Sequence, residues 1–246
     1  MNILLSNDDG YQAEGLRVLD EVLTSRGHMV YVSAPDREQS GKSHGFTISG
    51  EVIATEYAPR HYHMAGTPAD CVLYSHRCSL FPVEFDVVIS GINHGYNQST
   101  DIIYSGTCAA ARQATLDGIK AIALSAEGRD TALFKASAEF VADNLSFFSQ
   151  MIQPGSFMNI NVPLAFSGTW KAASIGDVLY QDRIVIRERR GKELVLEMES
   201  SSPEYRSSHS SSLKADHAIC LSGKASISII EALPSLSVEG MRELVK

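Results

Sequence analysis

The chain has 246 residues, of which 44% are hydrophobic and 20% charged, and its formal net charge is −8 at pH 7. This size and composition suit one large packed α/β domain, whereas the negative charge argues against a general binder of nucleic-acid backbones. No apolar run approaches the roughly 20 residues that cross a bilayer, and no basic segment precedes the first apolar run, so we expect neither a membrane partner nor a signal peptide.

The four cysteines are scattered along the chain and contain no C-x-x-C motif. Such spacing gives no zinc signature and suits reduced thiols in a reducing compartment. We therefore expect a cytoplasmic protein.

The first predicted elements form a βαβ unit. Residues 2–6 are a short apolar run and predict a buried strand, which a turn joins to a helix over residues 16–25. Residues 29–34 predict a second strand, which Pro35 ends. Two such strands around one helix predict a parallel pair.

The middle of the chain continues this alternation. Residues 36–45 predict a loop and residues 46–64 predict β-hairpin material. A helix is expected to begin after Thr67, with Pro68 in its first position and Asp70 in its third, and to run to about residue 78. The further predicted elements are a strand at 85–90, a long loop at 91–106, a helix at 107–118, a strand at 119–125, a helix at 132–151 and a strand at 157–162.

After residue 165 the pattern changes to antiparallel β pieces with no convincing helix. These pieces are expected at 172–178, 183–189, 194–199 and 226–230, and the Ser-rich residues 200–212 predict a solvated loop. The sequence therefore predicts a single α/β domain over residues 1–246. It comprises a core over 1–165, with a mostly parallel sheet flanked by helices, and a β-rich region over 166–246.

The most informative motif is the adjacent pair Asp8 and Asp9 at the carboxyl end of the first strand. Ligands of open α/β sheets bind at that edge. Neighbouring carboxylates repel each other unless positive charge lies between them, and a divalent cation with oxygen ligands is the simplest candidate. The alternative is a pair of acids that decorates a helix N-terminus.

Two further loops at the same edge carry oxygen donors. Ser40 offers a hydroxyl and Asn93 a carboxamide oxygen, so Asp8, Asp9, Ser40 and Asn93 form a set suited to Mg²⁺ or Mn²⁺. The run 41–43 is Gly-Lys-Ser, but it is no phosphate-binding P-loop, because Asp36 stands where that motif requires glycine.

An anion pocket is expected beside this cation. Ser105 and Thr107 lie at the start of a predicted helix, where hydroxyls and free N–H groups bind anions. Asn97 and Lys42 can add an amide and a positive charge. Plain N-capping and an ordinary turn are the alternatives. A metal next to an anion pocket is the arrangement used for phosphoryl chemistry.

The histidines leave other interpretations open. His94 can be a proton donor, although a surface role is the simpler interpretation. His61 and His63 can form a metal pair, although two exposed hairpin histidines are the simpler interpretation. The chain lacks the motifs of serine hydrolases and zincins, and it lacks the glycine pattern of nicotinamide-binding proteins.

Several motifs occur along the chain in a characteristic order and spacing. They are residues 3–10 (ILLSNDDG), 34–37 (APDR) with Ser40 and Gly41, 66–72 (GTPADCV), 90–93 (SGIN) with Gly95 and Asn97, 103–107 (IYSGT) with 109–111 (AAA), and 159–163 (NINVP). Together they resemble the SurE family of stationary-phase survival proteins, which are metal-dependent 5′/3′-nucleotidases.

This resemblance implies a Rossmann-like core with a β-rich C-terminal region that forms a homodimer or homotetramer, often by exchange of segments. It implies one Mg²⁺ or Mn²⁺ per subunit and hydrolysis of nucleoside 5′- and 3′-monophosphates, with short polyphosphate as a further substrate of some members. The implied metal ligands are Asp8, Asp9, Ser40 and Asn93, and the implied phosphate contacts are Asn97, Ser105, Gly106 and Thr107.

Departures from the family pattern include Glu14, where the family usually has proline, and the run 223–227 (GKASI). They lie in the substrate-rim and oligomerisation regions. For the reaction, direct attack by water is favoured over attack by Asp8 or Asp9 through an aspartyl phosphate. The alternative function is a non-catalytic regulatory protein that binds metal and nucleotide without turnover.

Overall fold

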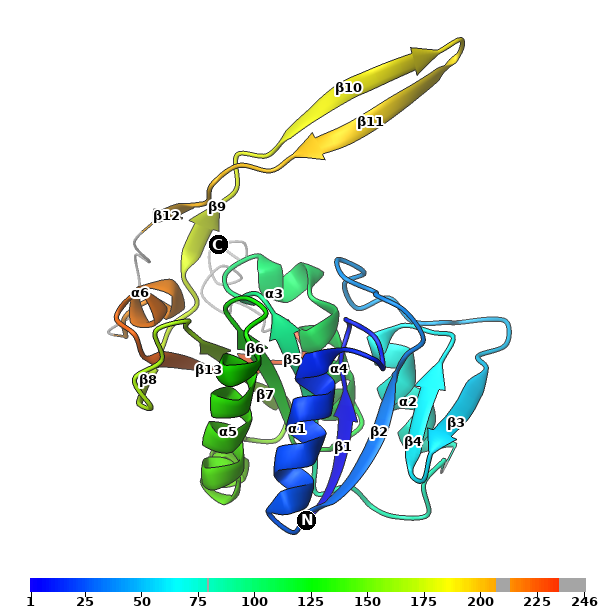
Figure 1. Cartoon of the computed structure of the whole chain (residues 1–246), viewed down its shortest axis with the longest axis vertical. Coiled ribbons are helices and arrows are strands. Elements are labelled where there is room, and N and C mark those ends of the chain that lie inside the picture. The colour runs from blue at the N-terminus through cyan, green and yellow to red at the C-terminus, as the bar shows by residue number, and fades with distance from the viewer. Residues whose placement is uncertain (79, 207–212, 235–246) are drawn as a thin grey trace, which may run out of the picture.

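A mixed sheet with helices on both faces forms the body of the molecule in this computed structural model, which describes residues 1–78, 80–206 and 213–234 (Figure 1). The strands of this sheet are β1 (Asn2–Ser6), β2 (Met29–Pro35), β3 (Ala54–Ala58), β4 (His61–Met64), β5 (Val87–His94), β6 (Ala121–Ala126), β7 (Ser156–Val162), β8 (Trp170–Ala172) and β13 (Ala225–Glu231). Across these residues their order is β3-β4-β2-β1-β5-β6-β7-β13-β8.

The central strands β1, β2, β5, β6 and β7 are mutually parallel. β1 lies between β2, which follows it in the chain, and β5, which comes later. The chain therefore changes direction across the sheet at β1, and such a topological switch point is where open α/β sheets bind ligands. The predicted α/β class with a mostly parallel sheet is confirmed.

Helices cover the two faces of the sheet. In Figure 1, α1 (Glu14–Ser25) and α5 (Thr131–Met151) lie in front of it, and α2 (Pro68–Arg77) and α4 (Gly106–Leu116) lie behind it. Within the described residues there are also two short helices, α3 (Asp101–Tyr104) and α6 (Asp216–Leu221).

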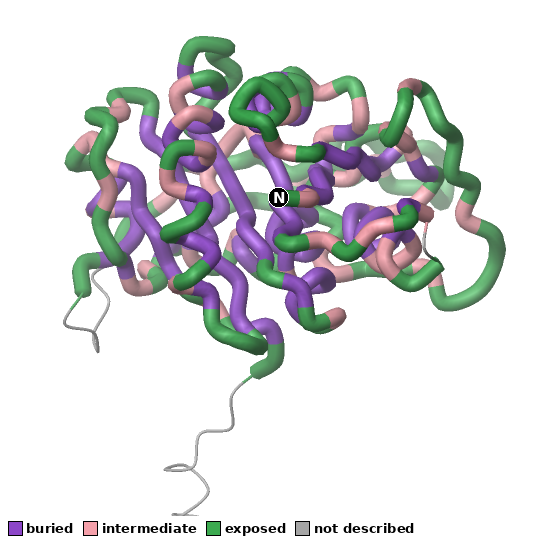
Figure 2. Tube along the Cα trace, turned by 90° about the horizontal axis from the view of Figure 1, so that it is seen from below, coloured by how far each residue is buried: buried purple, intermediate pink, exposed green. Residues whose placement is uncertain are grey.

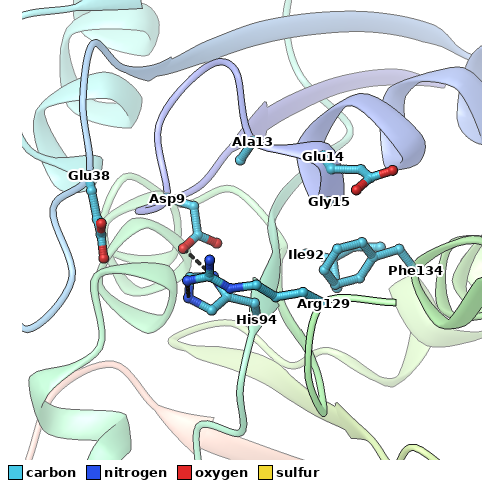
Figure 3. A pocket seen from close by; sticks show the side chains of 9 residues that line it. All are labelled: Asp9, Ala13, Glu14, Gly15, Glu38, Ile92, His94, Arg129 and Phe134. Carbon is cyan, nitrogen blue, oxygen red and sulfur yellow. Dashed lines mark hydrogen bonds and ion pairs between the residues drawn. The ribbon is translucent and has the colours of Figure 1, made fainter. Parts of the chain in front are cut away.

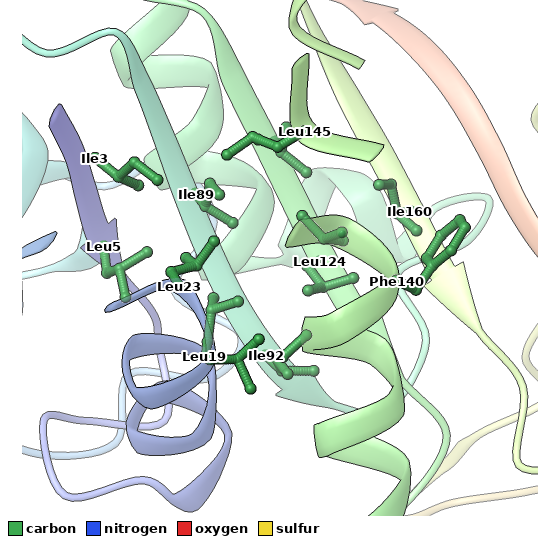
Figure 4. Packing of buried hydrophobic residues seen from close by; sticks show 14 of the residues in the cluster. Ile3, Leu5, Leu19, Leu23, Ile89, Ile92, Leu124, Phe140, Leu145 and Ile160 are labelled. Carbon is green, nitrogen blue, oxygen red and sulfur yellow. The ribbon is translucent and has the colours of Figure 1, made fainter. Parts of the chain in front are cut away.

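Alternating side chains of each central strand serve the two cores. Ile3 and Leu5 of β1 pack toward α1 and α5, whereas Leu4 between them packs toward α2 and α4. Figure 4 shows the first of these cores, and Figure 2 shows that buried residues concentrate along the central strands. Because helices cover both faces of the sheet, the sequences of the central strands are continuous apolar runs.

Local sequence signals set the start of α2 as predicted. The hydroxyl of Thr67 accepts a hydrogen bond from the backbone N–H of Asp70, and the carboxylate of Asp70 accepts one from the backbone N–H of Thr67. This capping box satisfies two N–H groups that the helix itself leaves unpaired.

The structure differs from the sequence prediction at the end of β5. The predicted strand stops at Ser90, but pairing with β6 resumes after an irregularity and extends to His94. Gly91 makes the close approach possible, because a Cβ atom there would lie 2.3 Å from the carbonyl oxygen of Leu124. A run of glycine and asparagine suggested a loop, whereas in the structure part of it continues the strand.

The region after residue 165 also differs in part. β13 pairs with β7 and β8, so a segment of the predicted β-rich region completes the main sheet. The helix α6 was not expected, because six residues are too few to show a helical period. β12 (Glu204–Arg206) lies in the predicted Ser-rich loop, and residues 207–212 of that loop lie outside the described part of the chain.

A β-hairpin projects away from the body of the molecule (Figure 1). It consists of β10 (Arg183–Arg190) and β11 (Glu193–Glu199), and the pair formed by β9 (Asp177–Leu179) and β12 connects it to the body. Among the described residues, no helix is both long enough and apolar enough to cross a membrane.

His61 on β4 links the edge of the sheet to α1. Its Nε2 lies 2.9 Å from Oδ2 of Asp20, and its Nδ1 lies 2.8 Å from the carbonyl oxygen of Pro59. Both partners are acceptors, so both contacts favour the protonated ring. The hydrogen bond to Asp20 raises the pKa of His61 above its ordinary value of 6.5. His61 lies in the hairpin as expected, but its side chain is only 18% exposed, so the expectation of an exposed histidine is wrong: the contact with Asp20 draws it against α1.

This pair predicts a pH-dependent contribution to stability. Because the folded-state pKa of His61 is raised, the contribution is complete below pH 6.5 and is lost as the pH rises through the folded-state pKa. Asp20→Asn should lower the free energy of unfolding by about 1 kcal/mol at pH 5.5 and by less at pH 8.5, measured by urea denaturation.

Glu21→Gln is the matched control, because Glu21 lies on the same helix and pairs with Arg17, which stays charged throughout. Its effect should be the same at both pH values. An equal loss at both pH values for Asp20→Asn would contradict the assigned role of His61.

Candidate active site

The candidate site lies at the topological switch point. Asp8 and Asp9 follow β1 directly, and Asn93 and His94 are the last residues of the neighbouring strand β5. The predicted edge of the sheet therefore brings these residues together, because parallel neighbours end on the same side.

Asp8 is buried against the N-terminus of α4. Its side chain accepts a hydrogen bond from the hydroxyl of Thr107 and others from the backbone N–H groups of Gly106 and Thr107. Only 3% of Asp8 is exposed, and burial raises its pKa while the hydrogen bonds from Thr107 oppose that rise. A Cβ atom on Gly106 would lie 2.6 Å from the Cβ of Asp8, so this approach requires glycine.

Asp9 is held by the end of β5. Its Oδ1 lies 2.6 Å from Nδ1 of His94, and 8% of its side chain is exposed. Burial raises the pKa of Asp9 to about 6, with a further contribution from the negative charge of Asp8, whereas His94 lowers it. The two carboxylates thus occupy a site where negative charge is unfavourable without a cation.

The other two predicted ligands come from segments that contact this pair. Ser40 follows Gln39, whose backbone N–H donates to the carbonyl oxygen of Asp8 at 2.7 Å. The amide nitrogen of Asn93 donates to the carbonyl oxygen of Gly95 at 2.8 Å, which leaves its carboxamide oxygen available as an acceptor. Ser40 is exposed, and its hydroxyl donates to Glu38 at 3.1 Å.

These donors fit a hard divalent cation. Two buried carboxylates supply negative charge, and a hydroxyl and a carboxamide supply neutral oxygens. Among the described residues, no group of three or more His, Cys, Asp and Glu side chains gathers so that it could hold a metal ion, so the predicted set needs the neutral oxygens of Ser40 and Asn93 as well. Burial raises the pKa of both Asp8 and Asp9, so a bound cation would favour their charged forms.

The predicted phosphate contacts at the start of α4 have structural partners. Ser105 is the N-cap of α4, and its hydroxyl accepts a hydrogen bond from the backbone N–H of Cys108 at 3.0 Å. Gly106 and Thr107 contact Asp8, as described above. The alternative of N-capping therefore holds for Ser105, and contact of these three residues with phosphate stays a prediction.

Asn97 lies in a buried hydrogen-bond network that joins the loop after β5 to strands β6 and β7. Its side-chain amide donates to the hydroxyl of Ser125 at 2.8 Å, and its backbone N–H donates to Oδ1 of Asn161 at 2.8 Å. Its carbonyl oxygen accepts from the side chains of Asn159 and Asn161. This network fixes the loop after β5, and its two β7 members were not predicted as site residues.

Lys42 lies on an exposed loop near the start of α4. The next residue, Ser43, donates from its backbone N–H to the carbonyl oxygen of Tyr104 at 2.9 Å, and Tyr104 directly precedes Ser105. Lys42 therefore belongs to a segment beside the predicted anion pocket, and its contact with phosphate stays a prediction.

A cavity of about 330 Å³ opens beside Asp9 (Figure 3). It is lined by Asp9, Ala13, Glu14, Gly15, Glu38, Ile92, His94, Arg129 and Phe134. Arg129 was not predicted as a site residue, although it lies on a loop that follows the parallel strand β6 at the same edge of the sheet. Loops that follow parallel strands gather at one edge of the sheet, and this rule could have predicted Arg129 as it predicted Asp8 and Asn93.

Comparison with known proteins places these motifs in one family. The family model described as Survival protein SurE matches residues 3–182. A protein from Gloeothece citriformis named 5′-nucleotidase SurE is 40% identical over 171 residues, which are 66% of this chain and 62% of that protein. A protein of the same name from Desulfitobacterium hafniense (strain DSM 10664 / DCB-2) is 38% identical over 74% of this chain and 73% of its own length.

The fold is likewise found among solved structures. A crystal structure of the Sure protein from Aquifex aeolicus matches all of this chain with a TM-score of 0.82 and 29% sequence identity, and the whole of that chain is covered. The resemblance inferred from the motifs is therefore confirmed at the level of sequence family and of fold.

The hydrogen-bond network around Asn97 predicts a stability effect. Asn161→Ala leaves a buried N–H group of Asn97 without its acceptor, so the free energy of unfolding should fall by about 1–3 kcal/mol, measured by urea denaturation. Asn144→Ala is the control, because the side chain of Asn144 donates to the carbonyl oxygen of Phe140 in its own helix. If the free energy of unfolding fell by the same small amount in both variants, the network would have no role in holding the loop.

Proposed function

The chain belongs to the SurE family, and on that basis we propose that it is a divalent-cation-dependent nucleotidase that hydrolyses nucleoside 5′- and 3′-monophosphates. The observation that carries this proposal is the buried pair Asp8 and Asp9 at the switch point of the sheet. The names of the related proteins support the 5′-nucleotidase activity. The 3′ activity and an activity on short polyphosphate are extensions of the proposal.

We propose that Asp8, Asp9, Ser40 and Asn93 hold one Mg²⁺ or Mn²⁺ per subunit. The fit of the donors described above supports this assignment. When bound, the cation supplies positive charge that stabilises the negative charge developing on the phosphate oxygens. The start of α4 and Lys42 are proposed to contact the phosphate, together with Asn97.

The protein's own residues favour direct attack by water over attack by an aspartate. Asp8 is almost fully buried, and its carboxylate accepts hydrogen bonds from Thr107 and Gly106, so it is poorly placed to act as a nucleophile. Asp9 is in contact with His94 through one of its oxygens. Both carboxylates are thus held in fixed positions, as cation ligands must be.

We further propose that two or four copies of the chain assemble through the projecting hairpin. One face of β10 and β11 is apolar and exposed, with Ile184 62% and Leu196 59% exposed. The opposite face carries ion pairs from Arg187 to Glu197 and Glu199. An isolated hairpin is only marginally stable in water, so covering the apolar face with a second copy would stabilise it.

A cytoplasmic location is part of the proposal and is supported by the four free thiols.

The proposed cation site predicts the effect of one substitution. Asp9→Asn keeps the shape of the side chain but removes the charge. Phosphate release from AMP with saturating Mn²⁺ should fall by about 1,000-fold, and Mn²⁺ binding should be lost, while the circular dichroism spectrum is unchanged.

Asp86→Asn is the control, because Asp86 directly precedes β5 at the opposite end of the sheet and accepts a hydrogen bond from the backbone N–H of Asn2. That variant should release phosphate at the normal rate. Near-normal turnover by Asp9→Asn would overturn the assignment of the site.

The proposed assembly predicts a change of mass in solution. Ile186→Glu places a charge in the apolar face of the hairpin and should convert the oligomer to a monomer of 26.7 kDa, measured by light scattering after gel filtration. Val185→Glu adds the same charge to the opposite face and should leave the oligomer intact. A monomeric unsubstituted protein, or an oligomeric Ile186→Glu variant, would contradict the proposal.

A further inference from the structure

We propose that His94 and Arg129 are positioning residues that orient the carboxylate of Asp9 toward the cation. The inference rests on the proposed function, because it assigns a role toward the cation of the same site. It concerns two residues beyond the predicted ligand and phosphate sets, and it gives His94 a supporting role in place of the surface role and the proton transfer that the sequence left open.

A continuous line of contacts joins the three side chains. Oδ1 of Asp9 lies 2.6 Å from Nδ1 of His94, and Nε2 of the same ring lies 2.7 Å from a terminal nitrogen of Arg129. Figure 3 shows the ring of His94 beside the carboxylate, with Arg129 reaching that ring from a different loop.

The donors in this line fix the tautomer of the ring. A guanidinium group can only donate, so Nε2 of His94 must be the acceptor in its contact with Arg129. The proton of the neutral ring is then on Nδ1, the ring nitrogen that lies 2.6 Å from Oδ1 of Asp9. A ring held in this way has no proton on Nε2 to give to a leaving group.

The loop that carries Arg129 is held on both sides. Before it, the carboxylate of Glu127 accepts hydrogen bonds from the hydroxyl of Tyr96 at 2.7 Å and from the backbone N–H of Leu164 at 2.9 Å. After it, the side chain of Asp130 caps α5 by accepting from the backbone N–H of Ala132 at 3.0 Å. The backbone on either side of Arg129 is therefore anchored to the body of the protein.

Orientation of Asp9 has a direct consequence for cation binding. A carboxylate whose rotation is restricted loses less freedom when a cation binds, and supporting residues of this kind commonly change metal affinity by about 10–100-fold. The backbone N–H of His94 also donates to Asp9, so the end of β5 holds this carboxylate through both its backbone and its side chain.

The test measures Mn²⁺ affinity of the full chain by electron paramagnetic resonance. His94→Phe and Arg129→Ala should each raise the Kd for Mn²⁺ by about 10–100-fold, and the double variant should lose little more than either single one, because both act through one line of contacts. His94→Asn, which can still donate to Asp9, should recover part of the affinity. Arg77→Ala is the control, since Arg77 pairs with Asp117 on the far side of the sheet, and should bind Mn²⁺ normally.

A second measurement needs no metal. Long-range nitrogen–proton NMR of histidine-labelled protein, assigned with His94→Asn, should show the Nδ1–H tautomer at His94, and Arg129→Ala should shift that signal.

A Nε2–H tautomer at His94 would overturn the inference. It would also be overturned if the His94→Phe or Arg129→Ala variant bound Mn²⁺ normally but lost turnover or bound AMP more weakly. Those last outcomes would assign proton transfer to His94 or substrate contact to Arg129. If the unsubstituted protein bound no Mn²⁺, the proposed function itself would fail.

Discussion

The burial of two adjacent carboxylates at the end of β1 is the constraint on which the rest of the site depends. Asp8 and Asp9 are adjacent in sequence and both largely withdrawn from water, and the charge of Asp8 adds to the cost of charging Asp9. Two sets of contacts hold these carboxylates. The N-terminus of α4 donates hydrogen bonds to Asp8, and the end of β5 contacts Asp9.

This constraint shapes the packing around the switch point. The N-terminus of α4 must approach Asp8 closely, which is why residue 106 is a glycine. The backbone of Gln39 is hydrogen-bonded to the backbone of Asp8, and Asn159 and Asn161 donate to the loop after β5. Three loops that are distant in sequence are thus fixed to one edge of the sheet. A cation bound there would balance charge that the protein otherwise leaves in an unfavourable setting.

Much of this arrangement could be predicted from the sequence, because it follows from local rules. Apolar runs bounded by turn residues located the central strands, and the Thr67 to Asp70 motif located the start of α2. The rule that parallel strands end on one edge predicts that Asp8, Asp9 and Asn93 lie together. The functional roles of these residues stay predictions.

The remaining features depend on tertiary contacts that no local pattern encodes. β5 continues through residues 91–94 because β6 offers a second stretch of pairing partners. Arg129 reaches the site because its loop is anchored by Tyr96 and by the cap of α5. Ser105 proved to be a helix cap, and the hydroxyl pattern alone did not separate that role from phosphate binding.

The central claim is that turnover depends on a divalent cation at the carboxyl end of β1. The most direct measurement is phosphate release from AMP before and after treatment of the protein with EDTA, followed by addition of Mn²⁺. The proposed function predicts that EDTA stops release and that Mn²⁺ restores it, with one ion bound per chain. Phosphate release that continues unchanged in EDTA would contradict the claim. Binding of Mn²⁺ and AMP without phosphate release under any condition would also contradict it, and would favour a protein that binds nucleotides without hydrolysing them.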